Sequence, residues 1–345
     1  MNKIRIGIAG LGRSGWGIHC RLISMLSDLY EIVAVCDPDE KRRKEAEEKF
    51  KCCSYDNYDN FVKDKNIEII VVATLSSLHT EHTIKALKSG KNVVCEKPMA
   101  TSLNDADRMI EVAKETGKIL TIFQNRRYSP DFLKVKEIIE SGIIGKVVLI
   151  KMYQHNFGRR WDWQTLKKYG GGLLNNWGPH LIDQALQLFG DEEEPEIFCH
   201  MEKTLTLGDA EDHVKIILKG RKSPTIDIEI TYCCCYPQEN WLVMGTKGGL
   251  KGTFSELKWK FFDPSDLPPR EVEEQPTPDR SYNIENIPWK QEQNWIATEK
   301  DKEFEKNFYI DLFETIRNNK PLKITPESVR KVMQIIEKCH QITGI

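Results

Sequence analysis

The feature that most constrains this chain is a glycine-rich turn at the end of its first apolar run. Ile4–Ala9 forms the run, and Gly10-Leu11-Gly12-Arg13-Ser14-Gly15 follows directly, which gives the spacing G-x-G-x-x-G at a strand-to-helix junction. We expect Gly10 to permit a tight turn, Gly12 to let the backbone approach a pyrophosphate, and Gly15 to let the helix pack closely on the strand. The pattern therefore predicts a dinucleotide-binding turn rather than a glycine-rich surface turn.

An acidic residue follows at the position where such turns carry one. The second expected strand ends at Asp37, roughly 20 residues after Gly15, where a carboxylate can accept hydrogen bonds from the adenosine ribose. This position favours NAD, because the 2′-phosphate of NADP would meet a negative charge. NADP stays open, since nearby cations can offset that charge, although they equally fit a solvated helix face. The cations are Arg13, Lys41, Arg42 and Arg43.

Short apolar runs alternate with helical patterns through residues 1–124. This alternation is typical of right-handed crossovers and a doubly wound parallel sheet. The expected strands are 4–9, 32–36, 69–73, 92–95 and 119–123, and the expected helices are 18–27, 40–50, 82–89 and 106–116. We therefore predict an NAD(P)-binding Rossmann domain over residues 1–124, and a chain of 345 residues has room for a second domain.

The pattern changes over residues 125–345. After a linking helix at 132–140, longer strands are expected at 146–154, 196–204, 213–218, 225–235 and 241–245. They predict an α+β domain with a large, mostly antiparallel, open-faced sheet for substrate binding and oligomerisation. We expect a homodimer or homotetramer through that face, because an open apolar face has to be covered. Residues 263–288 are expected to be irregular. A final helix is expected at 326–341, and one alternative is that this helix packs against the first domain.

Composition excludes several function classes. Fifty basic and 52 acidic residues give a net charge of -2, which offers no broad attraction for nucleic acid or anionic membranes. The strongest apolar run, 67–75, is too short to span a bilayer, and the N-terminus does not resemble a signal peptide. We therefore expect a cytoplasmic protein.

The ten cysteines do not predict a metal site. They are scattered or directly adjacent, as in Cys52-Cys53 and Cys233-Cys234-Cys235, with no C-x-x-C pair. Adjacent residues of a strand point to opposite faces, so we interpret the triple run as strand packing by reduced thiols.

Further motifs together carry a family resemblance. Residues 79–82 (His-Thr-Glu-His) lead to Glu96-Lys97-Pro98, at the carboxyl edge of the expected parallel sheet. With the glycine-rich turn, this segment resembles the glucose-fructose oxidoreductase, inositol dehydrogenase and rhizopine-catabolism (Gfo/Idh/MocA) family. Later segments resemble it in the same order: 125–130 (NRRYSP), 142–146 (GIIGK), 170–183 and 245–249 (GTKGG).

The resemblance implies a nucleotide-binding domain followed by an open-faced α/β domain, with hydride transfer between nicotinamide and a sugar, sugar acid or cyclitol. It implies that Lys97 binds cofactor and substrate and stabilises alkoxide charge, and that His180 exchanges the hydroxyl proton. The structural alternatives are a surface salt bridge for Lys97 and simple packing for His180. Asp183, three residues on, either orients His180 or bonds the backbone.

Two positions depart from the family pattern. Asn176 stands where many active members carry Asp; an amide holds a substrate hydroxyl but does not trade protons at neutral pH. We nevertheless count Asn176 as a catalytic and substrate-binding candidate. Thr74-Leu75-Ser76-Ser77 replaces the usual Thr-Pro-Asn, so a backbone contact is expected there rather than an Asn contact. The complete cofactor set is Gly10, Gly12, Arg13, Ser14, Gly15, Asp37, Thr74, His79, Glu96 and Lys97.

Carbohydrate binding favours aromatic platforms beside polar groups. The substrate set is Lys97, Arg127, Tyr153, Trp161, Asn176 and His180, and His155, Asn156, Arg160, Asp162, Trp163 and Trp177 are further candidates. Trp161 and Trp163 alternate along an extended segment, so core packing remains the alternative for one of them.

Three functions fit these residues. The first is an NAD(P)-dependent dehydrogenase or reductase of CH–OH groups. The second is a glycosidase that oxidises the sugar transiently with a retained NAD and eliminates the substituent. The third is a non-catalytic, sugar-responsive regulatory protein, against which the presence of both Lys97 and His180 argues.

Overall fold

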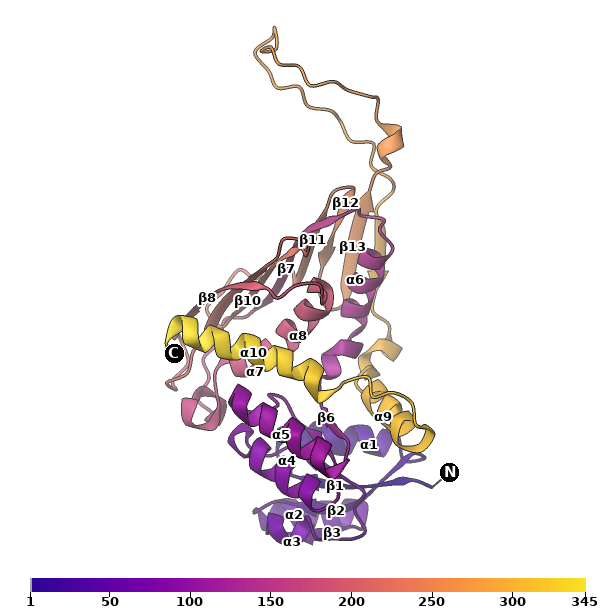
Figure 1. Cartoon of the computed structure of the whole chain (residues 1–345), viewed down its shortest axis with the longest axis vertical. Helices are drawn as coiled ribbons and strands as arrows, with labels where there is room; N and C mark the ends of the chain where they lie inside the picture. Colours follow the sequence, from indigo (N-terminus) through magenta and orange to yellow (C-terminus); the bar gives the residue numbers. More distant parts are fainter. Residues whose placement is uncertain (1) are drawn as a thin grey trace.

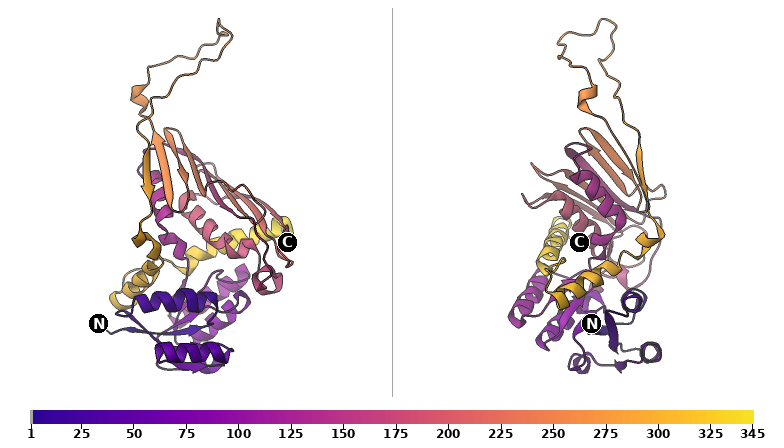
Figure 2. Two further views of the ribbon diagram at one scale, coloured as in Figure 1. Left: turned by 180° about the vertical axis from the view of Figure 1, so that it is seen from behind. Right: turned by 90° about the vertical axis from the view of Figure 1, so that its right-hand side faces the viewer.

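The structure, a computed structural model, describes residues 2–345. A parallel sheet with its helices occupies one end of the molecule, and a second, larger sheet occupies the middle (Figure 1). Two C-terminal helices lie where these parts meet, as both further views also show (Figure 2).

The first sheet has the expected doubly wound architecture. Its six strands lie in the order β3-β2-β1-β4-β5-β6 and pair in parallel. The strands are β1 (Ile4–Ala9), β2 (Tyr30–Cys36), β3 (Cys53–Tyr55), β4 (Ile69–Val72), β5 (Asn92–Cys95) and β6 (Leu120–Ile122). The short edge strand β3 was not predicted.

Helices connect these strands and have identifiable ends. A π-helical segment, Gly15–Cys20, leads into α1 (Arg21–Met25), and the others are α2 (Glu40–Phe50), α3 (Tyr58–Phe61), α4 (His79–Lys88) and α5 (Leu103–Thr116). Asp39 caps α2 by accepting from the backbone amides of residues 41 and 42. Ser102 caps α5, and Gly117 ends it in the left-handed conformation.

The second sheet is mostly antiparallel, as predicted. Its eight strands lie in the order β14-β13-β12-β11-β7-β10-β9-β8, and only the β7–β10 pair is parallel. The strands are β7 (Val147–His155), β8 (Glu196–Glu202), β9 (His213–Lys219), β10 (Thr225–Thr231), β11 (Trp241–Gly245), β12 (Gly248–Gly252), β13 (Glu256–Phe261) and β14 (Gln293–Ile296).

One face of this sheet is covered by helices. The covering helices are α6 (Pro130–Glu140), α8 (Gly178–Phe189) and α10 (Pro326–Thr343). Alternate residues such as Ile226, Ile228 and Ile230 of β10 are buried on this face, and α8 packs against this strand. The short helix α7 (Leu173–Asn176) precedes α8. The opposite face carries mixed polar and apolar side chains, among them Phe198, which is 55% exposed.

The predicted strand 225–235 is too long. Strand β10 ends at Thr231, whose hydroxyl accepts from the amide of Cys233 at 3.1 Å and turns the chain out of the sheet. Cys233 and Cys235 are exposed, so the interpretation of the cysteine run as strand packing is wrong. All ten cysteines are free thiols.

The end of the chain contains elements that the sequence analysis missed. Strands β12–β14 extend the second sheet, and the segment 262–292 between β13 and β14 projects away from the body (Figure 1). Helix α9 (Lys306–Asn318) follows it.

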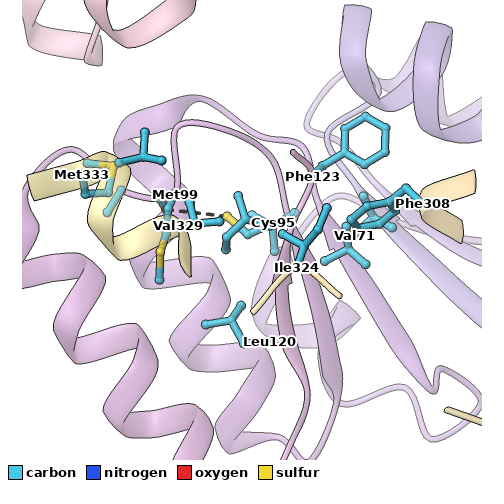
Figure 3. Close-up of a cluster of buried hydrophobic side chains, with 14 of the residues drawn as sticks. Val71, Cys95, Met99, Leu120, Phe123, Phe308, Ile324, Val329 and Met333 are labelled. Carbon is cyan, nitrogen blue, oxygen red and sulfur yellow. Dashed lines mark hydrogen bonds between the residues drawn. The ribbon is translucent and has the colours of Figure 1, made fainter. Parts of the chain in front are cut away.

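Helices α9 and α10 return to the first sheet. Figure 3 shows Phe308, Ile324, Val329 and Met333 from this segment packed against side chains of the parallel sheet and its helices. The hydroxyl of Thr121 donates to the carbonyl of Ile324 at 2.8 Å. The C-terminal segment therefore completes the core of the nucleotide-binding half.

Candidate active site

The glycine-rich turn has the geometry that a pyrophosphate requires. Gly10 has φ +88°, and a Cβ there would lie 2.5 Å from the carbonyl oxygen of Ala73. A Cβ on Gly15 would overlap the carbonyl of Gly10, whereas one on Gly12 would meet nothing within 4 Å. The space in front of Gly12 and the close packing at Gly15 fit a phosphate cradle.

Asp37 organises this turn. Its Oδ2 accepts from the amide of Leu11 at 2.7 Å, and its Oδ1 accepts from the amide of Asp39 at 2.9 Å. Of the four cations considered beside it, Arg13 and Arg42 line the adjoining cavity, and Arg42 lies 3.6 Å from Asp37. Arg43 instead donates to main-chain carbonyls, and Lys41 lies exposed on α2.

A cavity of about 810 Å³ extends from this turn along the carboxyl edge of the parallel sheet. It is large enough for a dinucleotide. With the exception of Gly15, every predicted cofactor residue lines it: Gly10, Gly12, Arg13, Ser14, Asp37, Thr74, His79, Glu96 and Lys97. Gly15 lies behind the turn, where it lets the chain pack closely.

Lys97 lies where this cavity meets a second one of about 350 Å³. Its Nζ donates to the main-chain oxygen of Asn176 at 2.8 Å and to Oδ1 of the same residue at 3.1 Å. Burial lowers the pKa of Lys97 to about 8, and three arginines, Arg13, Arg126 and Arg160, act in the same direction. The ammonium of Lys97 is thus poised to lose its proton near physiological pH.

His180 lines the second cavity from the first turn of α8. Its ring meets that of Trp177 edge to face at 6.0 Å, and among residues 2–345 its buried Nδ1 has no hydrogen-bond partner. Burial holds the pKa of His180 well below its usual 6.5, and the charge of Lys97 adds to this effect. The imidazole is therefore neutral at pH 7 and able to accept a proton.

Glu96 belongs to a buried hydrogen-bond network with His19 and Tyr309. Its Oε1 lies 3.1 Å from Nε2 of His19, whose Nδ1 lies 2.6 Å from the hydroxyl of Tyr309. Burial alone would raise the pKa of Glu96, but the contacts with His19 and Lys97 outweigh it and lower the pKa to about 2. The sequence analysis missed His19, because nothing in its local pattern links it to Glu96 and Tyr309.

Three predicted substrate residues lie away from both cavities. Arg127 forms a two-pronged ion pair with Asp183, at 2.8 and 2.6 Å, so it is held inside the protein. Tyr153 lies on the open face of the second sheet, where its hydroxyl bonds Asp227 at 3.2 Å. Trp161 is 77% exposed on the surface. The structure thus places these three side chains outside both cavities, and Asp183 bonds Arg127 rather than His180.

Other residues take their places around the cavities. Arg160, Asp162, Trp163 and Trp177 line one or both of them, whereas His155 and Asn156 do not. Residues that were not predicted also line the second cavity: Asn125, Arg126, Gln164, Tyr232 and Glu305. Arg126 adjoins the predicted Arg127 in the NRRY segment, which was the available signal.

This arrangement defines a nucleotide-binding oxidoreductase site, and comparisons with known proteins agree. Residues 4–124 match the oxidoreductase family with an NAD-binding Rossmann fold, and residues 132–251 match the GFO/IDH/MocA C-terminal domain. An uncharacterised oxidoreductase of Schizosaccharomyces pombe is 33% identical over 261 residues, which are 72% of this chain and 70% of that protein.

Two further relatives bear on the site. The Bacillus subtilis protein named scyllo-inositol 2-dehydrogenase (NADP(+)) IolW is 33% identical over 196 residues, 55% of this chain and 53% of that protein. The crystal structure of an NAD-binding protein from Listeria innocua superposes with a TM-score of 0.80 at 26% identity, covering 99% of this chain and 95% of that one.

The chain belongs to the Gfo/Idh/MocA oxidoreductase family. The predicted family, fold class and enzyme class are thereby confirmed. Within residues 2–345, the helices are all too short or too polar to cross a membrane, and His, Cys, Asp and Glu side chains form no group of three suited to a metal ion.

Proposed function

We propose that this protein transfers a hydride between a nicotinamide cofactor and a secondary alcohol or ketone of a sugar, sugar acid or cyclitol. One observation carries the proposal: Lys97 and Asn176 line both cavities, and His180 lines the second. A substrate carbinol in the smaller cavity therefore lies next to a proton acceptor, an ammonium group and the cofactor cavity. The inositol dehydrogenase among the relatives supports the substrate class.

The chain's own residues divide the proton chemistry between them. When bound, the nicotinamide accepts the carbinol hydride or returns it to a ketone. Neutral His180 accepts the hydroxyl proton at a ring nitrogen during oxidation and returns it during reduction. The ammonium of Lys97 stabilises negative charge on the substrate oxygen, and Asn176 fixes that ammonium through two acceptor oxygens.

Asp37 supports NAD as the preferred cofactor. Its carboxylate lines the larger cavity and keeps acceptor capacity beyond the amides of Leu11 and Asp39. Arg13 and Arg42, which face the same cavity, keep NADP as the second possibility, and the related NADP(+) enzyme supports that alternative. The ratio of kcat/KM values for NAD and NADP decides between them.

The proposal is tested by mixing the purified protein with NAD and a panel of cyclitols, sugars and sugar acids while NADH formation is followed by its absorbance. We expect NADH with one substrate class. Lys97→Ala and His180→Ala are each expected to lower kcat by about 10²- to 10⁴-fold while NADH binding is retained. The control variants are Lys88→Ala and His200→Ala, because both side chains are exposed and neither lines a cavity.

Other outcomes would move the function elsewhere. Aglycone release from glycosides without net NADH would establish the redox-assisted glycosidase. Cofactor binding with no turnover of any panel member would favour the regulatory protein. Wild-type turnover in either Ala variant, within about 10-fold, would refute the roles given to Lys97 and His180.

We further propose that the open face of the second sheet joins copies of this chain into a homodimer or homotetramer. On that face, Phe198 and Met244 are 55% and 43% exposed. Ile217 lies opposite Phe198 in the strand register, and Leu242 lies on the same strand as Met244, with Asp227 and Lys151 between the two pairs. Exposed apolar side chains among charged ones on one sheet face favour a protein interface.

We also propose a division of the chain at residues 124 and 125, and a cytoplasmic location. The family matches to 4–124 and 132–251 support the boundary. Ten free thiols support a reducing compartment.

A further inference from the structure

The guanidinium of Arg126 enters the smaller cavity without a direct ion pair. Its guanidinium is stacked near the rings of Trp177 and Phe254, with 5.2 and 5.3 Å from Cζ to the ring centroids. Among residues 2–345, no carboxylate lies within 4 Å of this guanidinium, and no side-chain hydrogen bond engages it. The N–H donors of Arg126 therefore have no hydrogen-bond partner among the residues that the structure describes and stay available to a ligand.

The acidic groups nearest to Arg126 are already committed elsewhere. Glu305, which lines the same cavity, accepts from Arg21 at 2.7 Å and from Asn125 at 2.8 Å. Asp131 accepts from the indole of Trp241 at 2.8 Å. Both carboxylates are thus held by other partners, and neither forms an ion pair with Arg126.

The other cations of this cavity add to the excess of positive charge. Arg160 is paired in two-pronged fashion with Asp162, but Lys97 contacts only the neutral oxygens of Asn176. Arg13 lines both cavities and would meet a pyrophosphate on the cofactor side. Glu96, which is bonded to His19, lines the same cavity and balances part of the charge of Lys97. In the described part of the chain, Arg126 is therefore left as a partly buried cation that faces a substrate with no carboxylate beside it.

Uncompensated buried charge is costly, and a ligand of opposite charge relieves it. We propose that the substrate carries an anionic group, a carboxylate or a phosphate, which binds the guanidinium of Arg126 while the reacting carbinol lies between Lys97 and His180. This inference rests on the proposed function, because it names the substrate class of the same site. Within that class it selects sugar acids and sugar phosphates over neutral sugars and cyclitols.

The test is equilibrium binding to the protein saturated with NADH, measured by calorimetry, so that it does not depend on turnover. The probes are glucose, galactose and mannose, each with its uronate and its 6-phosphate. We expect at least one anion to bind more tightly than its parent sugar, and the two anionic series to show which group is recognised. Arg126→Gln is expected to weaken binding of that anion by roughly 10- to 150-fold, the range for a hydrogen bond to a charged group.

The matched control is Arg159→Gln, which removes the same charge from an exposed position that lines neither cavity. It is expected to bind the anion as the wild type does. Arg126→Lys keeps the charge without the planar fork and should retain part of the preference, which guards against a folding defect in Arg126→Gln.

Three outcomes would each overturn the inference. The neutral sugars could bind as tightly as both of their anions, no anion could bind, or the preference for the anion could survive in Arg126→Gln. These failures are distinct from failure of the proposed function. Oxidation of neutral sugars alone would refute the anionic substrate and leave the dehydrogenase standing. Anion binding that depends on Arg126, without any hydride transfer, would refute the dehydrogenase and leave the anionic ligand standing.

Discussion

Lys97 and Asn176 are joined by two hydrogen bonds, from the lysine Nζ to the main-chain oxygen at 2.8 Å and to Oδ1 at 3.1 Å. The residue that positions the ammonium group is therefore an amide, which supplies acceptor oxygens but no negative charge. Burial lowers the pKa of Lys97 to about 8, and Asn176 does not restore it. This pair links the departure from the family sequence to a measurable pH dependence.

The first prediction concerns Asn176→Asp. Lys97 is an ammonium below about pH 8 and neutral above it, so activity should fall as the pH rises through this value. This fall in activity forms the alkaline limb of the pH–rate profile. A carboxylate at position 176 favours the charged lysine and should move the midpoint of the alkaline limb to a higher pH, by about 1 to 3 pH units. Initial rates at saturating NAD across pH check this.

The comparison variant is Asn175→Asp, which adds the same charge on the neighbouring residue. Asn175 lines the larger cavity and donates to the carbonyl of Gly171, with no bond to Lys97. It should shift the alkaline limb less than Asn176→Asp does. An unchanged limb in Asn176→Asp would show that Lys97 does not set it.

The second prediction separates cofactor binding from folding at the glycine-rich turn. A Cβ on Gly12 meets nothing within 4 Å, so Gly12→Ala should keep the unfolding free energy within about 0.5 kcal/mol. The added methyl group lies where the pyrophosphate approaches, and we expect the Kd for NADH to rise at least about 10-fold. Fluorescence titration with NADH and thermal melts measure the two effects.

Gly17→Ala is the control for this turn. Gly17 lies in the following helical segment, and a Cβ there also meets nothing within 4 Å. This variant should bind NADH normally. Equal weakening in both variants would place the pyrophosphate elsewhere.

Sequence patterns predicted the nucleotide-binding half well, because its strands are short apolar runs buried on both faces and its turn has a fixed glycine spacing. Strands β12–β14 were harder to predict. Strand β12 reads Gly248-Gly249-Leu250-Lys251-Gly252, which has little strand propensity, and its pairing with Trp241–Gly245 is a tertiary property. Helix α9 did contain a signal, since Phe308, Tyr309, Leu312 and Phe313 recur at helical spacing.

The site shows where local reasoning ends. Arg126 and Arg127 are neighbours of the same chemical type, yet the 3-10 turn Asn125–Tyr128 directs one to the cavity and the other to Asp183. Three residues per turn place adjacent side chains on different sides, and only the packed partners decide which side is the cavity. The position of Tyr153 was unpredictable for a related reason, because the register of the second sheet turns its side chain to the open face.

The third prediction tests Arg127 as a structural residue. Its ion pair with Asp183 is buried, with 12% and 2% of the two side chains exposed. Arg127→Ala leaves Asp183 buried without its partner and should cost about 3–5 kcal/mol of unfolding free energy. The double variant Arg127→Met, Asp183→Leu should recover much of this loss. Chemical denaturation measures the unfolding free energy of both variants. If Arg127→Ala instead raised the KM for substrate at unchanged stability, Arg127 would be a substrate-binding residue.

The last prediction tests the open face of the second sheet as the interface between copies of the chain. Phe198 lies on this face, 55% exposed and opposite Ile217 in the register of β8 and β9. Phe198→Glu should leave the fold intact, because the side chain is not in the core, but should weaken association by desolvating a charge against an apolar partner. We expect sedimentation equilibrium to show a smaller species with an unchanged circular dichroism spectrum. Val272→Glu, 93% exposed on the projecting segment 262–292, adds the same charge away from the face and should keep the wild-type mass. Dissociation by Val272→Glu but not by Phe198→Glu would assign the interface to the projecting segment.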